Sequence, residues 1–163
     1  MRSIIKVNWD SNLPIYMISQ AELQKKGINS LLLDVDGTLV NRKSNMIPKA
    51  VKNWILESKK LFSLYLISNN PSKKRIAKLA KELNLRYKYN ASKPRKKVTL
   101  SVIKEIGGDP KNIAIIGDRI FTDIIVGNRC NMKTILVKRL NRDGLPIKFN
   151  LTLTIEKLIT HFI

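Results

Sequence analysis

Two aspartates one residue apart, Asp34 and Asp36, are the side chains in this sequence best suited to chemistry. They lie in the run D-V-D-G-T-L-V, which directly follows an apolar stretch. One carboxylate of such a pair can attack phosphorus, while the other carries a proton to and from oxygen. Gly37 lets the chain turn sharply, so that backbone N–H groups can face a phosphate. An isolated pair of this kind is more often an acidic turn that caps the next element.

Two further segments carry a hydroxyl and a lysine at the ends of predicted strands. Ser68 is followed by two asparagines, and its hydroxyl can donate to a phosphate oxygen; taken alone, it fits a turn before Pro71 better. Lys93 precedes Pro94 and brings positive charge to a helix N-terminus, which already favours anions. Because many basic residues surround Lys93, this signal is weak by itself.

A second acidic pair, Asp118 and Asp123, lies in the run G-D-R-I-F-T-D after another apolar stretch. Asp118 is expected to emerge beside Asp34, and the two carboxylates could hold a hard cation such as Mg²⁺. Either acid of the pair could also cap a helix. Acid pair, hydroxyl, lysine and second acid pair nevertheless end successive strands of one predicted sheet, and their combination indicates a phosphate site.

The elements that must position these residues alternate between strands and helices. Short apolar stretches predict strands at 28–33, 61–67, 85–89, 112–116 and 133–137. Capped or amphipathic stretches predict helices at 19–27, from 48, from 72, from 94 to 107, and at 153–163. This alternation is typical of an α/β protein with a doubly wound, Rossmann-like, mostly parallel sheet of about five strands. In such sheets ligands bind beyond the carboxyl ends of the strands.

The length suits a single domain over 1–163, with 1–27 as an N-terminal arm and helix and 139–163 as a C-terminal extension. The stretch 13–18 is expected to pack on the sheet, although it could also lie in a membrane interface.

The charge balance is strongly basic. There are 31 Lys and Arg against 12 Asp and Glu, a formal net charge of +19. Such a surface attracts nucleic acid, anionic lipid headgroups or phosphorylated substrates, but compositional bias explains the excess equally well. A single cysteine, Cys130, excludes an internal disulfide and fits a reducing compartment. With no signal peptide and no long apolar span recognised, we expect a cytoplasmic location, either free or peripheral on the membrane.

The four segments D-V-D-G-T-L, S-N-N, K-P and G-D-R-I-F-T-D together resemble the four motifs of the haloacid dehalogenase-like (HAD) phosphatases, across nearly the whole chain. The longer runs G-I-N-S-L-L-L-D-V-D, G-D-R-I-F-T-D-I-I-V-G-N-R and T-I-L-V are similar to the YqeG-type branch, whose relatives include phosphatidylglycerophosphate phosphatases. Gly37 and Asn131 depart from that branch, which often has asparagine at the first position and usually glycine at the second. Neither departure touches a proposed catalytic group.

The resemblance implies a Mg²⁺-dependent phosphomonoester hydrolase that works through an aspartyl-phosphate. Asp34 would be the nucleophile, and Asp36 would protonate the leaving group and then activate water. The metal would be held by Asp34, by the backbone carbonyl of Asp36 and by Asp118.

The resemblance also implies roles for the remaining motif residues. Lys93 would be catalytic and would stabilise charge on the transferring phosphoryl group. Phosphate would be bound by Thr38, Ser68 and Asn69. Asp123 would orient the metal shell or Lys93 from behind. Arg119 is expected near the site.

The substrate expectation comes from the short intervals between the motifs. Residues 36–68 and 68–93 each already contain a predicted helix and strand, which leaves no room for the inserted cap domain of many small-metabolite enzymes in this superfamily. An open site suits a phosphate on a bulky carrier, so the favoured substrate is phosphatidylglycerophosphate and the favoured partner an anionic membrane surface. The enzymatic alternative is a phosphatase acting on nucleic-acid ends or on a soluble metabolite.

An alternative of another class is a basic RNA- or ribosome-binding protein on a vestigial phosphatase fold. Four intact acids argue against it, as does an aromatic content of 6%. The sole histidine, His161, lies in the C-terminal tail and gives little support to phosphohistidine or Ser-His-Asp mechanisms.

Overall fold

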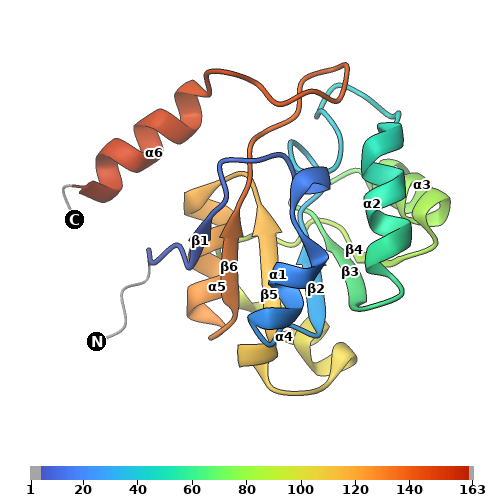
Figure 1. Ribbon diagram of the computed structural model, residues 1–163, viewed down its shortest axis with the longest axis vertical. Coiled ribbons are helices and arrows are strands. Elements are labelled where there is room, and N and C mark those ends of the chain that lie inside the picture. The colour runs from blue at the N-terminus through green and yellow to red at the C-terminus, as the bar shows by residue number, and fades with distance from the viewer. Residues whose placement is uncertain (1–4, 162–163) are drawn as a thin grey trace.

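Six parallel strands form one sheet in the computed structural model, which describes residues 5–161 (Figure 1). Their order is β1-β6-β5-β2-β3-β4. The strands are β1 (Trp9–Asp10), β2 (Ser30–Leu33), β3 (Ser63–Ile67), β4 (Arg86–Lys88), β5 (Ile113–Gly117) and β6 (Lys133–Leu136). The predicted parallel α/β sheet is confirmed, with one strand more than the expected five. The additional strand is β1, which pairs Trp9 with Ile135 and is too short to leave a periodic pattern.

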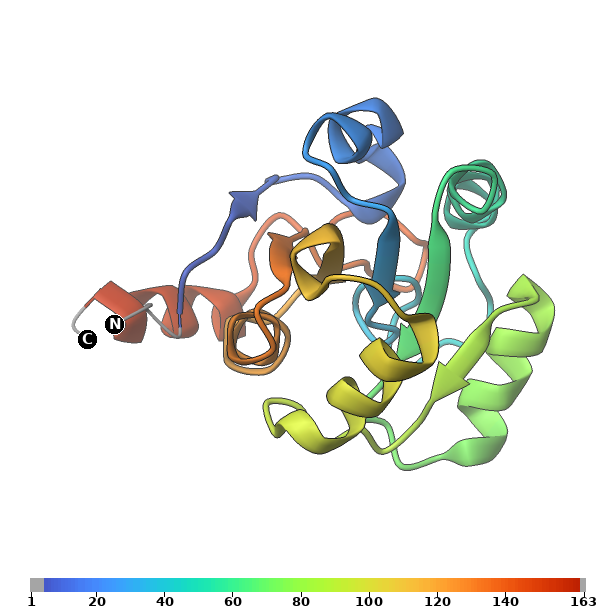
Figure 2. The same ribbon diagram turned by 90° about the horizontal axis from the view of Figure 1, so that it is seen from below.

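Helices cover both faces of the sheet. They are α1 (Gln20–Lys25), α2 (Lys49–Ser58), α3 (Lys73–Leu83), α4 (Lys96–Ile106) and α5 (Ile125–Arg129), whereas a further helix, α6 (Leu151–His161), lies to one side of the sheet. The first three pack with Leu31 and Leu33 on one face, whereas α4 and α5 pack with Leu32 on the other (Figure 2). Because β2 is buried on both faces, Leu31, Leu32 and Leu33 form a continuous apolar run rather than alternating with polar residues.

Local signals explain where several helices begin and end. The Ser19 hydroxyl accepts from the Glu22 amide at 3.3 Å and caps α1, and the Ser72 hydroxyl caps α3 in the same way through Arg75. Asn84 ends α3 with a φ of +51°. The π-helical turn Ile120–Ile124 and the short α5 were not predicted from the sequence.

The strand order brings the motif segments to one edge of the sheet. β2 lies between β5 and β3, and Leu33 is in register with Ile116 and with Leu66. The chain runs from β2 outward through β3 and β4, and then crosses to β5 on the other side. The point where the order reverses therefore lies between β2 and β5, where ligands bind in open α/β sheets.

The N-terminal arm packs against the domain. Ile15 and Ile18 are buried, and the Trp54 indole of α2 donates to the Ile18 carbonyl at 2.8 Å. Met17, between them, is 56% exposed. Packing, rather than interfacial exposure, is what the structure records for most of the stretch 13–18.

The C-terminal helix differs from expectation in how it packs. A helix was predicted at 153–163; α6 is Leu151–His161, and residues 162–163 lie outside the described residues. Its apolar periodicity indicated packing on the core, but most of its large apolar side chains face solvent and α6 projects from one side of the molecule (Figure 1). Within residues 5–161, none of the helices has the length and apolarity needed to cross a bilayer.

Candidate active site

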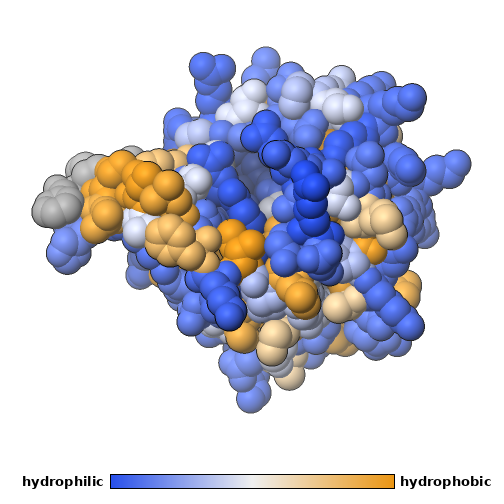
Figure 3. Space-filling model, turned by 90° about the horizontal axis from the view of Figure 1, so that it is seen from above, coloured by the Kyte–Doolittle hydropathy of each residue, from blue (hydrophilic) through white to orange (hydrophobic). Residues whose placement is uncertain are grey.

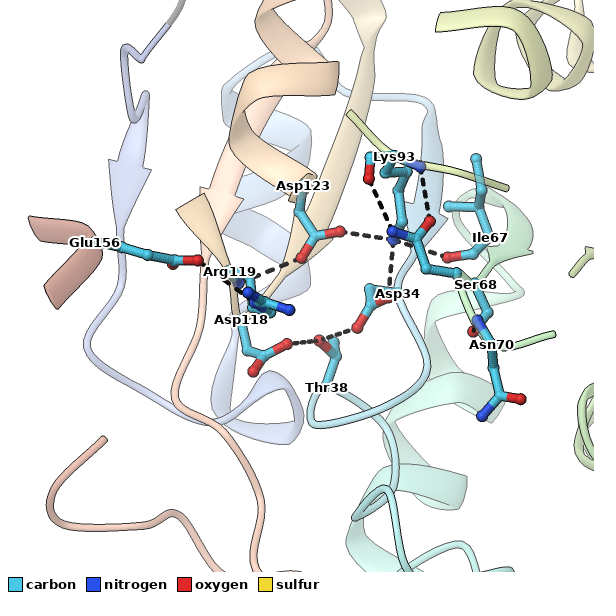
Figure 4. Close-up of polar contacts among 11 residues, drawn as sticks. Asp34, Thr38, Ile67, Ser68, Asn70, Lys93, Asp118, Arg119, Asp123 and Glu156 are labelled. Carbon is cyan, nitrogen blue, oxygen red and sulfur yellow. Dashed lines mark hydrogen bonds and ion pairs between the residues drawn. The ribbon is translucent and has the colours of Figure 1, made fainter. Parts of the chain in front are cut away.

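Three carboxylates meet where β2 and β5 end. One oxygen from each of Asp34, Asp118 and Asp123 lies within 4.8 Å of the others (Figure 4). Asp34 follows β2, Asp118 follows β5, and Asp123 comes from the π-helical turn. Asp34 is 7% exposed, whereas Asp118 and Asp123 are each 1% exposed. Asp34 is therefore the member of the cluster that is most open to a substrate.

Two glycines make room for these carboxylates. A Cβ on Gly37, whose φ is +95°, would lie 2.7 Å from an oxygen of Asp118. A Cβ on Gly117 would lie 2.3 Å from the carboxyl group of Asp123. Both distances are far below van der Waals contact, so the cluster has its present form only with glycine at both positions.

Lys93 lies among the carboxylates from the opposite side. Its Nζ donates to Asp34 Oδ1 at 2.8 Å, to Asp123 Oδ1 at 2.6 Å and to the Ile67 carbonyl at 3.0 Å. Burial alone would lower the pKa of Lys93, but the carboxylates of Asp123 and Asp34 outweigh it and raise that pKa above its ordinary value. The lysine is therefore a fixed cation at neutral pH.

Burial, together with the close packing of the carboxylates, raises the pKa values of Asp118 and Asp123. Burial raises the pKa of Asp118 to about 7, and the charges of Asp34 and Asp123 add to the effect. Burial likewise raises the pKa of Asp123 to about 6, against the lowering influence of Lys93. Arg139 partly compensates Asp118, with Nε 2.5 Å from Oδ2. Three buried carboxylates whose mutual repulsion is only partly offset form an all-oxygen donor set, and such a set fits a hard divalent cation.

The predicted phosphate-binding residues lie around this cluster but are differently engaged. Thr38 is fully buried, and its hydroxyl donates to Asp34 Oδ2 at 3.0 Å. Ser68 lines the cleft, and its oxygen accepts from the Asn70 amide at 3.1 Å. The Asn69 side chain donates to the Lys93 carbonyl at 2.8 Å and accepts from the Lys93 amide at 2.7 Å. Asn69 thus holds the backbone that carries the lysine.

The loop after Asp34 uses some of its amides internally. The Gly37 N–H donates to the Val40 carbonyl at 2.7 Å, and the Thr38 N–H donates to the Val35 carbonyl at 3.3 Å. The expectation that loop amides face a phosphate therefore does not apply to these two N–H groups.

Asp36 is held apart from the other acids. Its Oδ2 accepts from Asn70 Nδ2 at 2.7 Å, and its Oδ1 lies 2.6 Å from Nη1 of Arg75. Arg75 also donates to the carbonyls of Asn41 and Ser44. Sequence reasoning missed Arg75, because a basic residue in the lysine-rich helix α3 gives no signal of its own. It also missed Arg139, although this residue closely follows a predicted strand end.

The site opens into a cleft of about 690 Å³. Cations are prominent among its lining residues: Arg42, Lys43, Lys93, Arg119, Arg139 and Arg142. The expected position of Arg119 near the site agrees with this lining. Arg129 instead donates to the Pro94 carbonyl at 2.9 Å.

Comparisons with known proteins agree with this arrangement. Residues 90–143 match the model of the HAD-hydrolase-like family. The chain is 28% identical over 138 residues to a protein named "Probable phosphatase YqeG" from Bacillus subtilis (strain 168), covering 83% of this chain and 80% of that protein.

Solved structures share the fold at low sequence identity. An uncharacterized protein from Listeria monocytogenes serotype 4b has a TM-score of 0.57 at 17% identity, covering 77% of this chain and 86% of that one. YfnB from Bacillus subtilis, described as a HAD-hydrolase bound to magnesium, has a TM-score of 0.55 at 14% identity, and the match covers 74% of this chain and 90% of that one.

Proposed function

We propose that this chain, a HAD-like phosphatase of the YqeG-type branch, hydrolyses phosphomonoesters through an aspartyl-phosphate formed on Asp34. The strongest support is the surroundings of Asp34. Its carboxylate is the most exposed of the buried cluster and opens on the cleft, with a fixed cation, Lys93, at 2.8 Å. Lys93 would offset the repulsion between this carboxylate and a dianionic phosphate.

The donor set of the cluster fits Mg²⁺, which would be held by the side chains of Asp34 and Asp118 and by the backbone carbonyl of Asp36. When bound, the ion would supply Lewis-acid stabilisation of charge on the phosphoryl oxygens. Asp123 would position Lys93 without contacting the substrate. It accepts from the Lys93 ammonium at 2.6 Å and from the Arg119 backbone amide at 3.3 Å. The hydroxyls of Thr38 and Ser68 would bind phosphate oxygens after turning from their present partners.

Asp36 would move the proton. Its carboxyl would first donate to the leaving alkoxide and later take a proton from the water that attacks the aspartyl-phosphate. Asn70 and Arg75, at 2.7 and 2.6 Å, would fix the position of this carboxyl relative to the cleft.

For the substrate we propose a lipid phosphomonoester, phosphatidylglycerophosphate, met at an anionic membrane by a peripheral cytoplasmic protein. The resemblance to the YqeG-type branch suggests this substrate. Two features of the cleft are consistent with it: the rim is rich in cations, and between β2 and β3 the described chain adds only one helix, α2. Such a cleft would admit a headgroup while the rest of the lipid stays outside. Nucleic acid is a less favoured ligand.

The test is phosphate release from phosphatidylglycerophosphate in mixed micelles with Mg²⁺, comparing the natural chain with Asp34→Asn. We expect release by the natural chain alone, with a fall of at least about a thousandfold for the variant, because no other group can replace the nucleophile. Circular dichroism checks that the variant is folded. A fully active, folded Asp34→Asn protein would overturn the mechanism.

The same experiment separates mechanism from substrate. If the natural chain hydrolyses a simple aryl phosphate but not the lipid, the lipid proposal fails. The search then turns to nucleic-acid ends and soluble phosphorylated metabolites.

A further inference from the structure

Helix α6 carries an apolar stripe on its solvent-facing side. The residues of the stripe recur at helical spacing and are Leu151, Ile155, Leu158 and Ile159. Their exposed fractions are 61%, 47%, 56% and 41%, respectively. The preceding loop adds Leu145 and Phe149, which are 58% and 68% exposed. Contiguous exposed apolar groups of this kind mark interaction sites on soluble domains.

The stripe faces outward because polar contacts fix the other side of the helix. Glu156, only 2% exposed, accepts from the Ile120 amide at 2.8 Å and pairs with Arg119 at 3.4 Å. Lys157 pairs with Asp10 at 2.7 Å. An ordinary surface helix turns its apolar stripe to the core and its charges to water. In α6 the buried carboxylate of Glu156 and the side chain of Leu153, which packs against the apolar cluster that contains Ile120 and Ile124, take the inner position, so the outward direction of the stripe is built into the packing.

The stripe is close to the mouth of the catalytic cleft. Thr152, next to Leu151, lines that cleft together with Ile147 of the preceding loop. Figure 3 shows the hydrophobic side chains of α6 on the same face as the polar, cation-rich surroundings of the cleft. A surface that contacts the stripe would therefore also come close to Arg42, Lys43 and Arg142.

We propose that α6 and the cationic rim of the cleft form a docking surface for an anionic lipid bilayer, with α6 lying in the membrane interface. The helix has 11 residues and is about 16 Å long, so it is too short to cross a hydrocarbon core of about 30 Å. A short amphipathic helix beside basic groups suits an interfacial position, in which apolar side chains enter the acyl boundary and cations meet the headgroups.

Charge decides between a membrane and a second copy of this chain. Each copy has a formal net charge of +19, so two copies brought together through this cationic face repel one another, whereas an anionic bilayer attracts it. This inference extends the proposed function, because docking would present a lipid phosphomonoester to the cleft. Docking itself requires no catalysis and can be measured separately.

The experiment is co-sedimentation with phosphatidylcholine vesicles, with and without phosphatidylglycerol, at about 0.15 M salt, where exposed charges are partly screened. The test variant is Ile155→Ser/Leu158→Ser. The control is Leu56→Ser/Leu100→Ser, which removes one leucine on α2 and one on α4 that are 58% and 45% exposed, a range similar to that of the test pair. We expect the natural chain and the control to pellet with the anionic vesicles and the α6 variant to bind about tenfold more weakly or worse. None of these four residues belongs to the proposed machinery, so hydrolysis of a soluble aryl phosphate should be equal in all three proteins.

Two results would overturn the docking proposal. One is equal vesicle binding by the natural chain and the α6 variant, which would assign binding to the general charge. The other is no binding by the natural chain to anionic vesicles, including the case in which sedimentation velocity shows that α6 joins two copies. Because these vesicles contain no substrate, either result leaves the phosphatase proposal standing. Conversely, docking without lipid hydrolysis would refute the proposed lipid substrate and leave the docking proposal standing.

Discussion

Each carboxylate of the candidate site lies beside a basic side chain. Lys93 bonds two carboxylates at once, Arg139 contacts Asp118, and Arg75 holds Asp36. Asp34, Asp118 and Asp123 form the candidate metal cluster, whereas Asp36 is set apart and pairs with Arg75. This division matches the two tasks proposed for the site, which are attack on phosphorus and movement of a proton.

Arg75 is a positioning residue if Asp36 acts as the general acid. We expect Arg75→Met to lower kcat/KM on an alkyl phosphate by about ten- to a hundredfold, because kcat/KM reports formation of the aspartyl-phosphate, and in that step Asp36 without its ion pair is no longer held in place to protonate the leaving alkoxide. The loss should be much smaller on p-nitrophenyl phosphate, whose leaving group needs no proton. Steady-state kinetics on the two substrates measure the difference, with Lys78→Met on the exposed side of α3 as the control. Equal losses on both substrates would reduce Arg75 to a structural role.

We expect the proton on Asp118 to make cation binding at the acidic cluster depend on pH. Since burial raises its pKa to about 7, the metal-free protein takes up a proton there near neutrality, and a cation must displace that proton. We expect Mg²⁺ affinity to weaken by up to about tenfold per pH unit below about pH 7, with proton release on binding. Calorimetry in two buffers of different ionisation enthalpy measures both, and Asp143→Asn, at an exposed aspartate, should behave like the natural chain. Affinity independent of pH between about 6 and 8 would contradict the assignment of this proton.

The same raised pKa has a consequence for stability. A carboxyl group whose folded pKa lies above its unfolded value contributes stability that is complete below about pH 4 and is lost as pH rises through about 7. For the metal-free protein, Asp118 therefore opposes folding at alkaline pH, and a bound cation would relieve that cost.

At the scale of the elements, Gly117 at the end of β5 packs directly against the Asp123 side chain. We expect Gly117→Ala to lower the free energy of unfolding by about 1–3 kcal/mol and also to reduce kcat, because the new methyl group displaces Asp123 and with it Lys93. Gly127→Ala is the matched control. Its Cβ would meet Thr134 and Ile115 at 2.5 and 2.6 Å, on the α5 side of the sheet, so stability should fall while kcat is retained. Urea unfolding and aryl phosphate hydrolysis measure the two quantities, and a fully active Gly117→Ala protein would show that the Asp123 position is not needed.

The elements also show what periodicity can and cannot predict. Strands such as β2 and β5 could be predicted because burial on both faces gives each of them a continuous apolar run, Leu31–Leu33 in β2 and Ile113–Ile116 in β5. The two residues of β1 are too few for a pattern, and a π-helical turn leaves no distinct spacing. For α6 the periodicity correctly predicted a helix, but periodicity does not specify which surface a stripe faces. The buried Glu156 reverses the expected direction.

At the scale of the whole molecule, topology makes most of the candidate site predictable. All strands are parallel, so residues that follow them must gather at one edge, and Asp34, Ser68 and Asp118 do so. Long side chains are different, because Arg75 and Arg139 reach the acids from positions that no strand-end rule singles out. The excess of positive charge could be counted from the sequence, but its gathering at the cleft depends on how loops far apart in the chain fold together.

The strand order also determines when β2 can find its two neighbouring strands during synthesis of the chain. β2 and the segment after it leave the ribosome early, whereas β5, which pairs with the other edge of β2, is made only after β4 and α4. Until then one edge of β2, a strand that is wholly buried in the finished fold, has no neighbour, and such an edge can pair with other chains. A partly made chain that ends before Asp118 would carry the proposed nucleophile, Asp34, without the complete acidic cluster of the candidate metal site. Under the proposed mechanism, activity would therefore begin only after β5 has been made and the sheet has closed around β2.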